Sequence, residues 1–163
     1  MNGSATNEYL RTGGGGDAPL VSVLTPCFNG EVHLGRLIES VLAQTHPNIE
    51  FTLVNDGSTD GTDGVVESYR DRIESELTRF VYVQQENAGL GGALNGGLPH
   101  VTGQYLCWPD ADDYLEPRSV ELRLEAFLEN PECAVVTSDA FIRREGVGGE
   151  VLKLVSAGAR KNH

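Results

Sequence analysis

The acidic run Asp110-Ala111-Asp112-Asp113 is the part of the sequence with the most evident chemistry. Carboxylates crowded this closely repel one another, and a bound cation is the most favourable way to hold them together. Hard oxygen ligands on a short loop suit Mg²⁺ or Mn²⁺, which keep open coordination positions for substrate phosphates. The alternative is a solvated loop in which one aspartate caps a helix that begins near Pro117.

A second polar segment, Asp56–Gly61, also carries several side-chain oxygens. Counted from Asp56, the residues at the ligand positions and the glycine position of a helix–loop–helix calcium site are Ser58, Asp60, Gly61 and Glu67. The preceding residues Glu50–Val54 have the pattern of a strand, which counts against that hypothesis. A turn followed by a helix cap over Ser58–Thr62 is the simpler alternative. Asp56, the first residue after the strand, could accept hydrogen bonds from a base or a ribose.

The glycine-rich segment Asn87–Gly92 leads from a predicted strand into a predicted helix. Glycines there permit close approach of a phosphate or ribose, and a helix N-terminus favours an anion. The dinucleotide-binding fingerprint is not matched, because Leu94 stands where its third glycine is required. Tight packing of the helix on a sheet is the alternative explanation for the glycines. Phe28, which follows Pro26, could stack on a base or close the edge of the core.

Regular alternation of apolar patterns shows which elements must position these residues. Short β-branched or apolar runs predict strands, and apolar residues three and four apart predict helices. The predicted strands are residues 20–25, 51–54, 80–83, 104–108 and 134–137. The predicted helices cover residues 34–42, 66–77, 90–98 and 117–128, the last with Pro117 as its first residue.

Strand–helix alternation predicts an α/β fold with a central, mostly parallel sheet and helices on both faces. Ligands of such sheets bind beyond the carboxyl ends of the strands, near a topological switch point. The four segments that begin at Pro26, Asp56, Glu86 and Asp110 each follow a predicted strand. We therefore expect them to gather at one edge of the sheet.

Length and composition limit the organisation and the partners. The 163 residues suffice for one domain, and the glycine-rich segment 1–18 is expected to be a disordered tail before a folded part at 19–163. A net charge of −12, from 12 basic and 24 acidic residues, argues against nucleic acid. The sequence contains neither an apolar run of membrane-spanning length nor a signal peptide. Three widely spaced cysteines suggest reduced thiols, so a cytoplasmic location is expected, with or without peripheral attachment to the inner face of a membrane.

Together, the segments LVSVLTPCFNGE, VNDGSTDGT, NAGLGGALN and PDADD resemble the family 2 glycosyltransferases in order and spacing. The resemblance covers roughly Pro19 to Thr137 and implies a Rossmann-like GT-A fold, a nucleotide-diphospho-sugar donor, usually a UDP-sugar, and Mn²⁺ or Mg²⁺. It places Pro26 and Phe28 in the base pocket, with Glu31 nearby.

The same resemblance implies roles for the later motifs. Asp56 would hydrogen-bond the uracil ring, and Asn87 would help to hold the nucleotide. Asp110 and Asp112 match the DxD element of the family, which contacts the ribose and, through the metal, the diphosphate. Asp113 could share the metal, and the sequence leaves open which carboxylate is the direct ligand.

The implied reaction is transfer with inversion, in which a general base deprotonates an acceptor hydroxyl that attacks the anomeric carbon. Two departures from the family pattern stand out. Leu94 replaces an arginine that many relatives carry, and the acidic pair that supplies the base is expected beyond His163, so the sequence suggests a domain truncated at its C-terminus. A non-catalytic nucleotide-sugar-binding module is one alternative. A sugar-nucleotide pyrophosphorylase is another, although TPCFNGE lacks the glycine- and arginine-rich loop of that class. Neither the donor sugar nor the acceptor is indicated.

Overall fold

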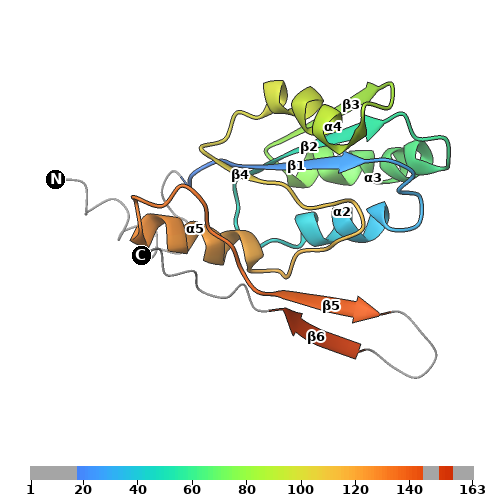
Figure 1. Ribbon diagram of the computed structural model, residues 1–163. Coiled ribbons are helices and arrows are strands. Elements are labelled where there is room, and N and C mark those ends of the chain that lie inside the picture. Colours follow the sequence, from blue (N-terminus) through green and yellow to red (C-terminus); the bar gives the residue numbers. More distant parts are fainter. Residues whose placement is uncertain (1–17, 145–150, 156–163) are drawn as a thin grey trace. The chain divides into compact units, whose positions relative to one another are not determined.

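The computed structural model describes residues 18–144 and 151–155, so most of the predicted tail lies outside the described residues. The chain forms two compact units, residues 1–122 and 123–163. The first unit contains the parallel sheet and three of its flanking helices (Figure 1). Helix α5 (Ser119–Glu129) begins in the first unit and ends in the second.

The sheet of the first unit has four parallel strands in the order β3-β2-β1-β4. Its strands are β1 (Val21–Cys27), β2 (Ile49–Asp56), β3 (Arg79–Gln85) and β4 (Tyr105–Cys107). The chain adds β2 and β3 on one side of β1 and then crosses to its other side for β4. The carboxyl ends of β1 and β4 therefore form a topological switch point. The predicted α/β fold with a parallel central sheet is confirmed.

Helices cover both faces of this sheet. Helices α2 (Leu34–Leu42) and α3 (Thr62–Glu76) lie together below the sheet in Figure 1, and α4 (Gly89–Gly97) lies above it. A short 3₁₀ helix, η1 (Leu98–His100), follows α4. Each residue of β1 and β2 is buried, because both strands have a neighbour on each side and helices on each face.

The predicted apolar faces of the helices account for the core. On α2 the buried apolar side chains are Leu34, Leu37, Ile38 and Val41. Each such side chain contributes about 1.5–3 kcal/mol when it leaves water. On α4 the close contact is made by a glycine: a Cβ at Gly97 would lie 2.2 Å from Leu24 Cδ1.

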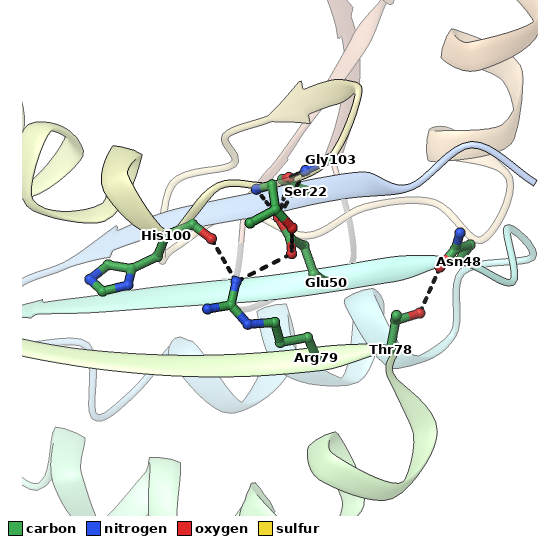
Figure 2. A network of polar contacts seen from close by, with 8 residues as sticks. Ser22, Asn48, Glu50, Thr78, Arg79, His100 and Gly103 are labelled. Atoms are coloured by element: carbon green, nitrogen blue, oxygen red, sulfur yellow. Dashed lines mark hydrogen bonds and ion pairs between the residues drawn. The ribbon is translucent and has the colours of Figure 1, made fainter.

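A buried carboxylate joins strands at the amino-terminal edge of the sheet (Figure 2). Glu50 on β2 accepts hydrogen bonds from the Ser22 hydroxyl at 2.5 Å and the Gly103 N–H at 3.1 Å. Thr102 donates both its N–H, at 2.5 Å, and its hydroxyl, at 2.6 Å. Arg79 on β3 pairs with the same carboxylate at 3.5 Å. Burial raises the pKa of Glu50, but these hydrogen bonds outweigh burial and bring it to about 2.

The second unit contains an antiparallel pair, β5 (Ala140–Arg144) and β6 (Val151–Val155). The predicted strand at 134–137 is wrong, since these residues form no strand and Val135 is 68% exposed. Their β-branched composition favours a strand, but a strand needs a neighbour to pair with, and β5 begins only at Ala140. Helix α5 likewise begins at Ser119, two residues later than predicted, because Pro117 and Arg118 form a turn.

Candidate functional site

A pocket of about 280 Å³ lies at the switch point between the carboxyl ends of β1 and β4. Because β1 and β4 are parallel neighbours, the segments that follow them meet at one edge of the sheet. The pocket is lined by Pro26, Phe28, Asn29, Gly30, His33, Leu90, Asp110, Ala111 and Asp112. It therefore combines an apolar wall, an acidic wall and one imidazole.

The apolar wall comes from two elements far apart in the sequence. Pro26 lies within β1, Phe28 follows its end, and Leu90 is in the first turn of α4. Phe28 is 54% exposed and Leu90 is 62% exposed, so both offer apolar surface to a ligand. A flat or apolar group, such as a base or the carbon face of a sugar, suits such a wall.

The acidic wall is a turn. The N–H of Asp113 donates to the carbonyl oxygen of Asp110 at 3.1 Å, and Asp110 and Asp112 both line the pocket, whereas Asp113 does not. Partial burial, with smaller contributions from the charges of Asp112 and Asp110, raises the pKa of Asp113. Within the described part of the chain, no side chain or backbone group donates a hydrogen bond to these three carboxylates.

The donor chemistry of this wall partly fits a divalent cation. Asp110 and Asp112 bring hard oxygen ligands to one pocket, which is the chemistry Mg²⁺ and Mn²⁺ prefer. Across residues 18–144 and 151–155, no group of three or more His, Cys, Asp and Glu side chains comes close enough to hold a metal. A cation here would therefore complete its coordination with ligand phosphates and water.

Asp56 and Asn87 lie beside one another at the ends of β2 and β3, but neither lines the pocket. Asp56 is buried, and its Oδ1 accepts from Gln85 Nε2 at 2.7 Å and from the Ala88 N–H at 2.9 Å. Gly57 has a φ of +72°, and a Cβ there would lie 2.8 Å from the Asn87 nitrogen. The loop after β2 thus fixes the segment that carries Asn87.

Glu31 is turned to a neighbouring loop and does not line the pocket. Its carboxylate accepts from the Gly61 N–H at 3.1 Å, and its own N–H donates to Asp60 Oδ2 at 3.0 Å. These contacts join the segment after β1 to the start of α3. Glu31 therefore holds the segment that carries Phe28 to the loop before α3.

The calcium hypothesis for Asp56–Gly61 is wrong. A strand, β2, precedes the segment, so the helix–loop–helix arrangement is absent from this part of the described chain. Asp60 accepts hydrogen bonds from the N–H groups of Thr62 and Glu31, so its oxygens already serve the backbone. The alternative of a turn before the helix describes this segment better: Gly61 is the N-cap residue of α3 and has no side chain to cap it, and Asp60, one residue earlier, accepts from the Thr62 N–H at 3.1 Å.

His33 and Leu90 were not among the site residues expected from the sequence. His33 is the N-cap residue of α2 and lies two residues after the segment LVSVLTPCFNGE, but a single histidine with no ligand spacing to another gave no signal of a role. Leu90 is the first residue of the predicted helix 90–98, where an apolar side chain is explained by packing alone. Its position one residue after the Gly89 turn was the available signal, because the first turn of a helix that follows a strand points at the ligand edge.

Comparison with known proteins supports a glycosyltransferase. The model of the family described as glycosyl transferase family 2 matches residues 22–154. The chain belongs to glycosyl transferase family 2. An uncharacterized glycosyltransferase of Rickettsia prowazekii is 38% identical over 120 residues, which are 72% of this chain and 36% of that protein.

Solved structures have the same fold. S. aureus TarS 1–349 in complex with UDP matches 68% of this chain and 32% of its own, with 30% identity and a TM-score of 0.59. The mannosyltransferase PcManGT of Pyrobaculum calidifontis, in complex with GDP-Man and Mn²⁺, matches 69% of this chain and 33% of its own, with 27% identity and a TM-score of 0.62. The family 2 chain thus spans about a third of the length of these relatives.

Among the described residues, no helix combines the length and the apolar character needed to cross a membrane.

Proposed function

We propose that this chain is the donor-binding part of an inverting, GT-A-type glycosyltransferase that uses a nucleotide-diphospho-sugar, with a UDP-sugar as the first candidate. The observation that carries the proposal is the pocket at the switch point, where Pro26 and Phe28 meet Asp110 and Asp112. Family 2 membership adds support and favours a transferase over a pyrophosphorylase. The complexes of TarS with UDP and of PcManGT with GDP-Man supply the chemical class of ligand.

The charge of the pocket supports a metal-dependent site. The described lining contains two carboxylates and one histidine but neither lysine nor arginine. A diphosphate beside Asp110 and Asp112 would be repelled unless a cation lay between them. Asp110 and Asp112, which both line the pocket, would hold Mn²⁺ or Mg²⁺. The cation would supply positive charge for the diphosphate as it leaves.

The remaining predicted site residues would contact different parts of the nucleotide. Phe28 and Pro26 would line the base, and Asp56 would hydrogen-bond the uracil ring while its Oδ1 keeps the following loop in place. Asn87 is exposed beside Asp56 and would contact the nucleotide from that loop. Glu31 would act from outside the pocket, through its hydrogen bond to Gly61.

The chemical step needs a base and an acceptor. A base removes the proton of an acceptor hydroxyl, the oxygen attacks the anomeric carbon from the face opposite the diphosphate, and the nucleoside diphosphate leaves with inversion. No residue of the described pocket is assigned as this base. We propose that it belongs to a segment of the full-length enzyme that follows the residues of this chain.

Calorimetric titration of UDP, with and without Mn²⁺, tests the donor site. We expect binding that requires Mn²⁺ and is lost in Asp112→Asn, because the amide cannot replace a charged ligand. Asp71→Asn is the matched control, since Asp71 is an exposed carboxylate on α3 away from the pocket. Equal binding by the wild type and Asp112→Asn would overturn the assignment of the acidic wall. Absence of UDP and GDP binding at every metal concentration would overturn the proposed function.

A further inference from the structure

The acidic loop Asp110–Asp113 receives little support from its own residues. Only one backbone hydrogen bond, from Asp113 to Asp110, closes the turn within the described chain. The strand before it, β4, has only three residues, paired with β1 from Val21↔Tyr105 to Val23↔Cys107. Its carboxylates repel one another, so contacts outside the loop must keep them at the pocket.

Those contacts come from α2 and from the residues that directly follow it. Arg36 and Ser40 are four residues apart on α2, so they lie on one face of the helix. Gln44 lies two residues after the end of α2, and its Nε2 is hydrogen-bonded to the Ser40 carbonyl oxygen. We refer to these three residues as the α2 stripe. The apolar face of α2 is buried beside this stripe, which fixes the helix against the sheet. His33, which lines the pocket, is the N-cap residue of the same helix.

Ser40 makes the contact nearest to the loop on the buried side. Its hydroxyl donates to the Leu37 carbonyl at 2.7 Å, which leaves its oxygen to accept from the Leu115 N–H at 3.0 Å. Both Ser40 and Leu115 are buried, so no water replaces this bond without displacing the chain. Leu115 is two residues from Asp113.

Both the nitrogen and the oxygen of the Gln44 side-chain amide are hydrogen-bonded to the backbone that follows the acidic loop. Its Nε2 donates to the carbonyl oxygens of Ser40, at 2.9 Å, and Glu116, at 2.8 Å. Its Oε1 accepts from the Val120 N–H at 3.0 Å. At the other end of the stripe, the Arg36 guanidinium lies 4.2 Å from the centroid of the Tyr114 ring, and Tyr114 directly follows Asp113.

We propose that the α2 stripe formed by Arg36, Ser40 and Gln44 is a positioning element that holds the acidic loop at the donor pocket. The stripe joins the pocket wall at His33 to the wall at Asp110 and Asp112 through one rigid helix. The positions of the metal-holding carboxylates are thereby set from outside the pocket, by groups that touch neither cation nor donor. The inference rests on the proposed function for its effect on binding, but not for its effect on the loop itself.

Two readouts test the stripe. The first is the Mn²⁺ concentration that gives half-maximal UDP binding, measured for Ser40→Ala, Gln44→Met and the double variant. Loss of groups that orient metal ligands typically weakens metal affinity by 10–100-fold, so we expect a rise of about tenfold or more in the double variant. The second is hydrogen exchange of the backbone amides of residues 111–115 and 120, which should become faster in the same variants.

Matched variants separate positioning from general stability. Ser40→Thr keeps the hydroxyl and should restore the wild-type Mn²⁺ dependence. Ile73→Val, at a buried site on α3, should lower the midpoint of thermal unfolding without changing that dependence. Should the double variant fail to fold, the two single variants carry the test with the same expected direction.

Three results would overturn the inference or its basis. Wild-type Mn²⁺ dependence and exchange in folded Ser40→Ala and Gln44→Met would overturn the positioning role. An equal loss in Ile73→Val would show that lowered stability alone is responsible. Absence of UDP binding by the wild type would remove the proposed function, and faster exchange at residues 111–115 in the variants would still establish that the stripe holds the loop.

Discussion

The two edges of the parallel sheet treat their carboxylates in opposite ways. At the amino-terminal edge, Glu50 is buried and receives hydrogen bonds from Ser22, Thr102 and Gly103 (Figure 2). At the carboxyl edge, Asp110 and Asp112 are exposed and accept no hydrogen bond within the described chain. The first arrangement stabilises the charged form of a carboxylate by protein groups alone, and the second leaves it for something that the protein binds.

This difference indicates that the amino-terminal edge contributes to the stability of the fold and that the carboxyl edge is suited to binding a ligand. Donors that surround Glu50 lower its pKa, whereas burial and neighbouring carboxylates raise the pKa of Asp113. A site with unsatisfied charges is unfavourable in the free protein and becomes favourable when an opposite charge arrives. Changes at the amino-terminal edge should therefore affect folding, and changes at the carboxyl edge should affect binding.

The largest expected effect on folding is that of Glu50→Ala. The substitution removes the acceptor of the buried Ser22 hydroxyl and of both Thr102 donors, and it removes the charge that pairs with Arg79, so we expect a loss of about 3–5 kcal/mol in the free energy of unfolding. Urea denaturation followed by circular dichroism measures it. Glu67→Ala, which removes an exposed partner of Arg70, is the control and should cost less than about 1 kcal/mol. A loss below 1 kcal/mol for Glu50→Ala would remove the contrast between the edges.

The pH dependence of stability should show a smaller effect of the same carboxylate. The pKa of Glu50 falls from 4.5 to about 2 on folding, so its contribution is fully present above pH 4.5 and is lost as the pH falls through the folded value. We expect wild-type protein to lose up to about 3 kcal/mol more than Glu50→Gln between about pH 5 and about pH 2. Parallel acid dependence of the two urea midpoints would show that Glu50 is not the group responsible.

An exposed ion pair tests whether burial, and not charge pairing alone, makes the amino-terminal edge stable. Arg72 and Glu39 pair at 2.7 Å with both side chains 49% exposed. We expect Glu39→Gln to cost about 0.2–1 kcal/mol at low salt and less at high salt, because solvent and ions screen the pair. Thermal unfolding at the two salt concentrations measures the difference. A salt-independent loss larger than this would assign the stability to pairing in general.

The smallest effect on folding is expected for Asp112→Asn. At the carboxyl edge this substitution is the counterpart of Glu50→Gln at the amino-terminal edge, since both replace a carboxylate by an amide. Since no donor within the described chain serves Asp112 and Asp113 lies next to it, the free energy of unfolding should change by less than about 0.5 kcal/mol without metal. Mn²⁺ should raise the midpoint of thermal unfolding of the wild type in the presence of UDP and leave that of the variant unchanged. A large destabilisation of metal-free Asp112→Asn would give the acidic loop a structural role.

The sequence predicted the α/β fold and most of its strands, because apolar periodicity records which face of each element is buried. It predicted that the chemical residues follow strands, and Pro26, Phe28, Asp110 and Asp112 do meet in one pocket. It failed at residues 134–137, where β-branched side chains suggested a strand that has no neighbour to pair with. It also gave no sign of Glu50, which appears as one polar residue in an apolar strand.

Tertiary structure alone decided which motifs share a pocket. The strand order β3-β2-β1-β4 places the ends of β1 and β4 side by side, while Asp56 and Asn87 lie at the ends of β2 and β3. It also turned Glu31 toward Gly61 and brought Ser40 and Gln44 onto a segment more than seventy residues away. Local patterns determine what each element is, since they depend on neighbours in the chain. Proximity between elements depends on how the sheet is ordered, and that order is fixed only when all the strands pack together.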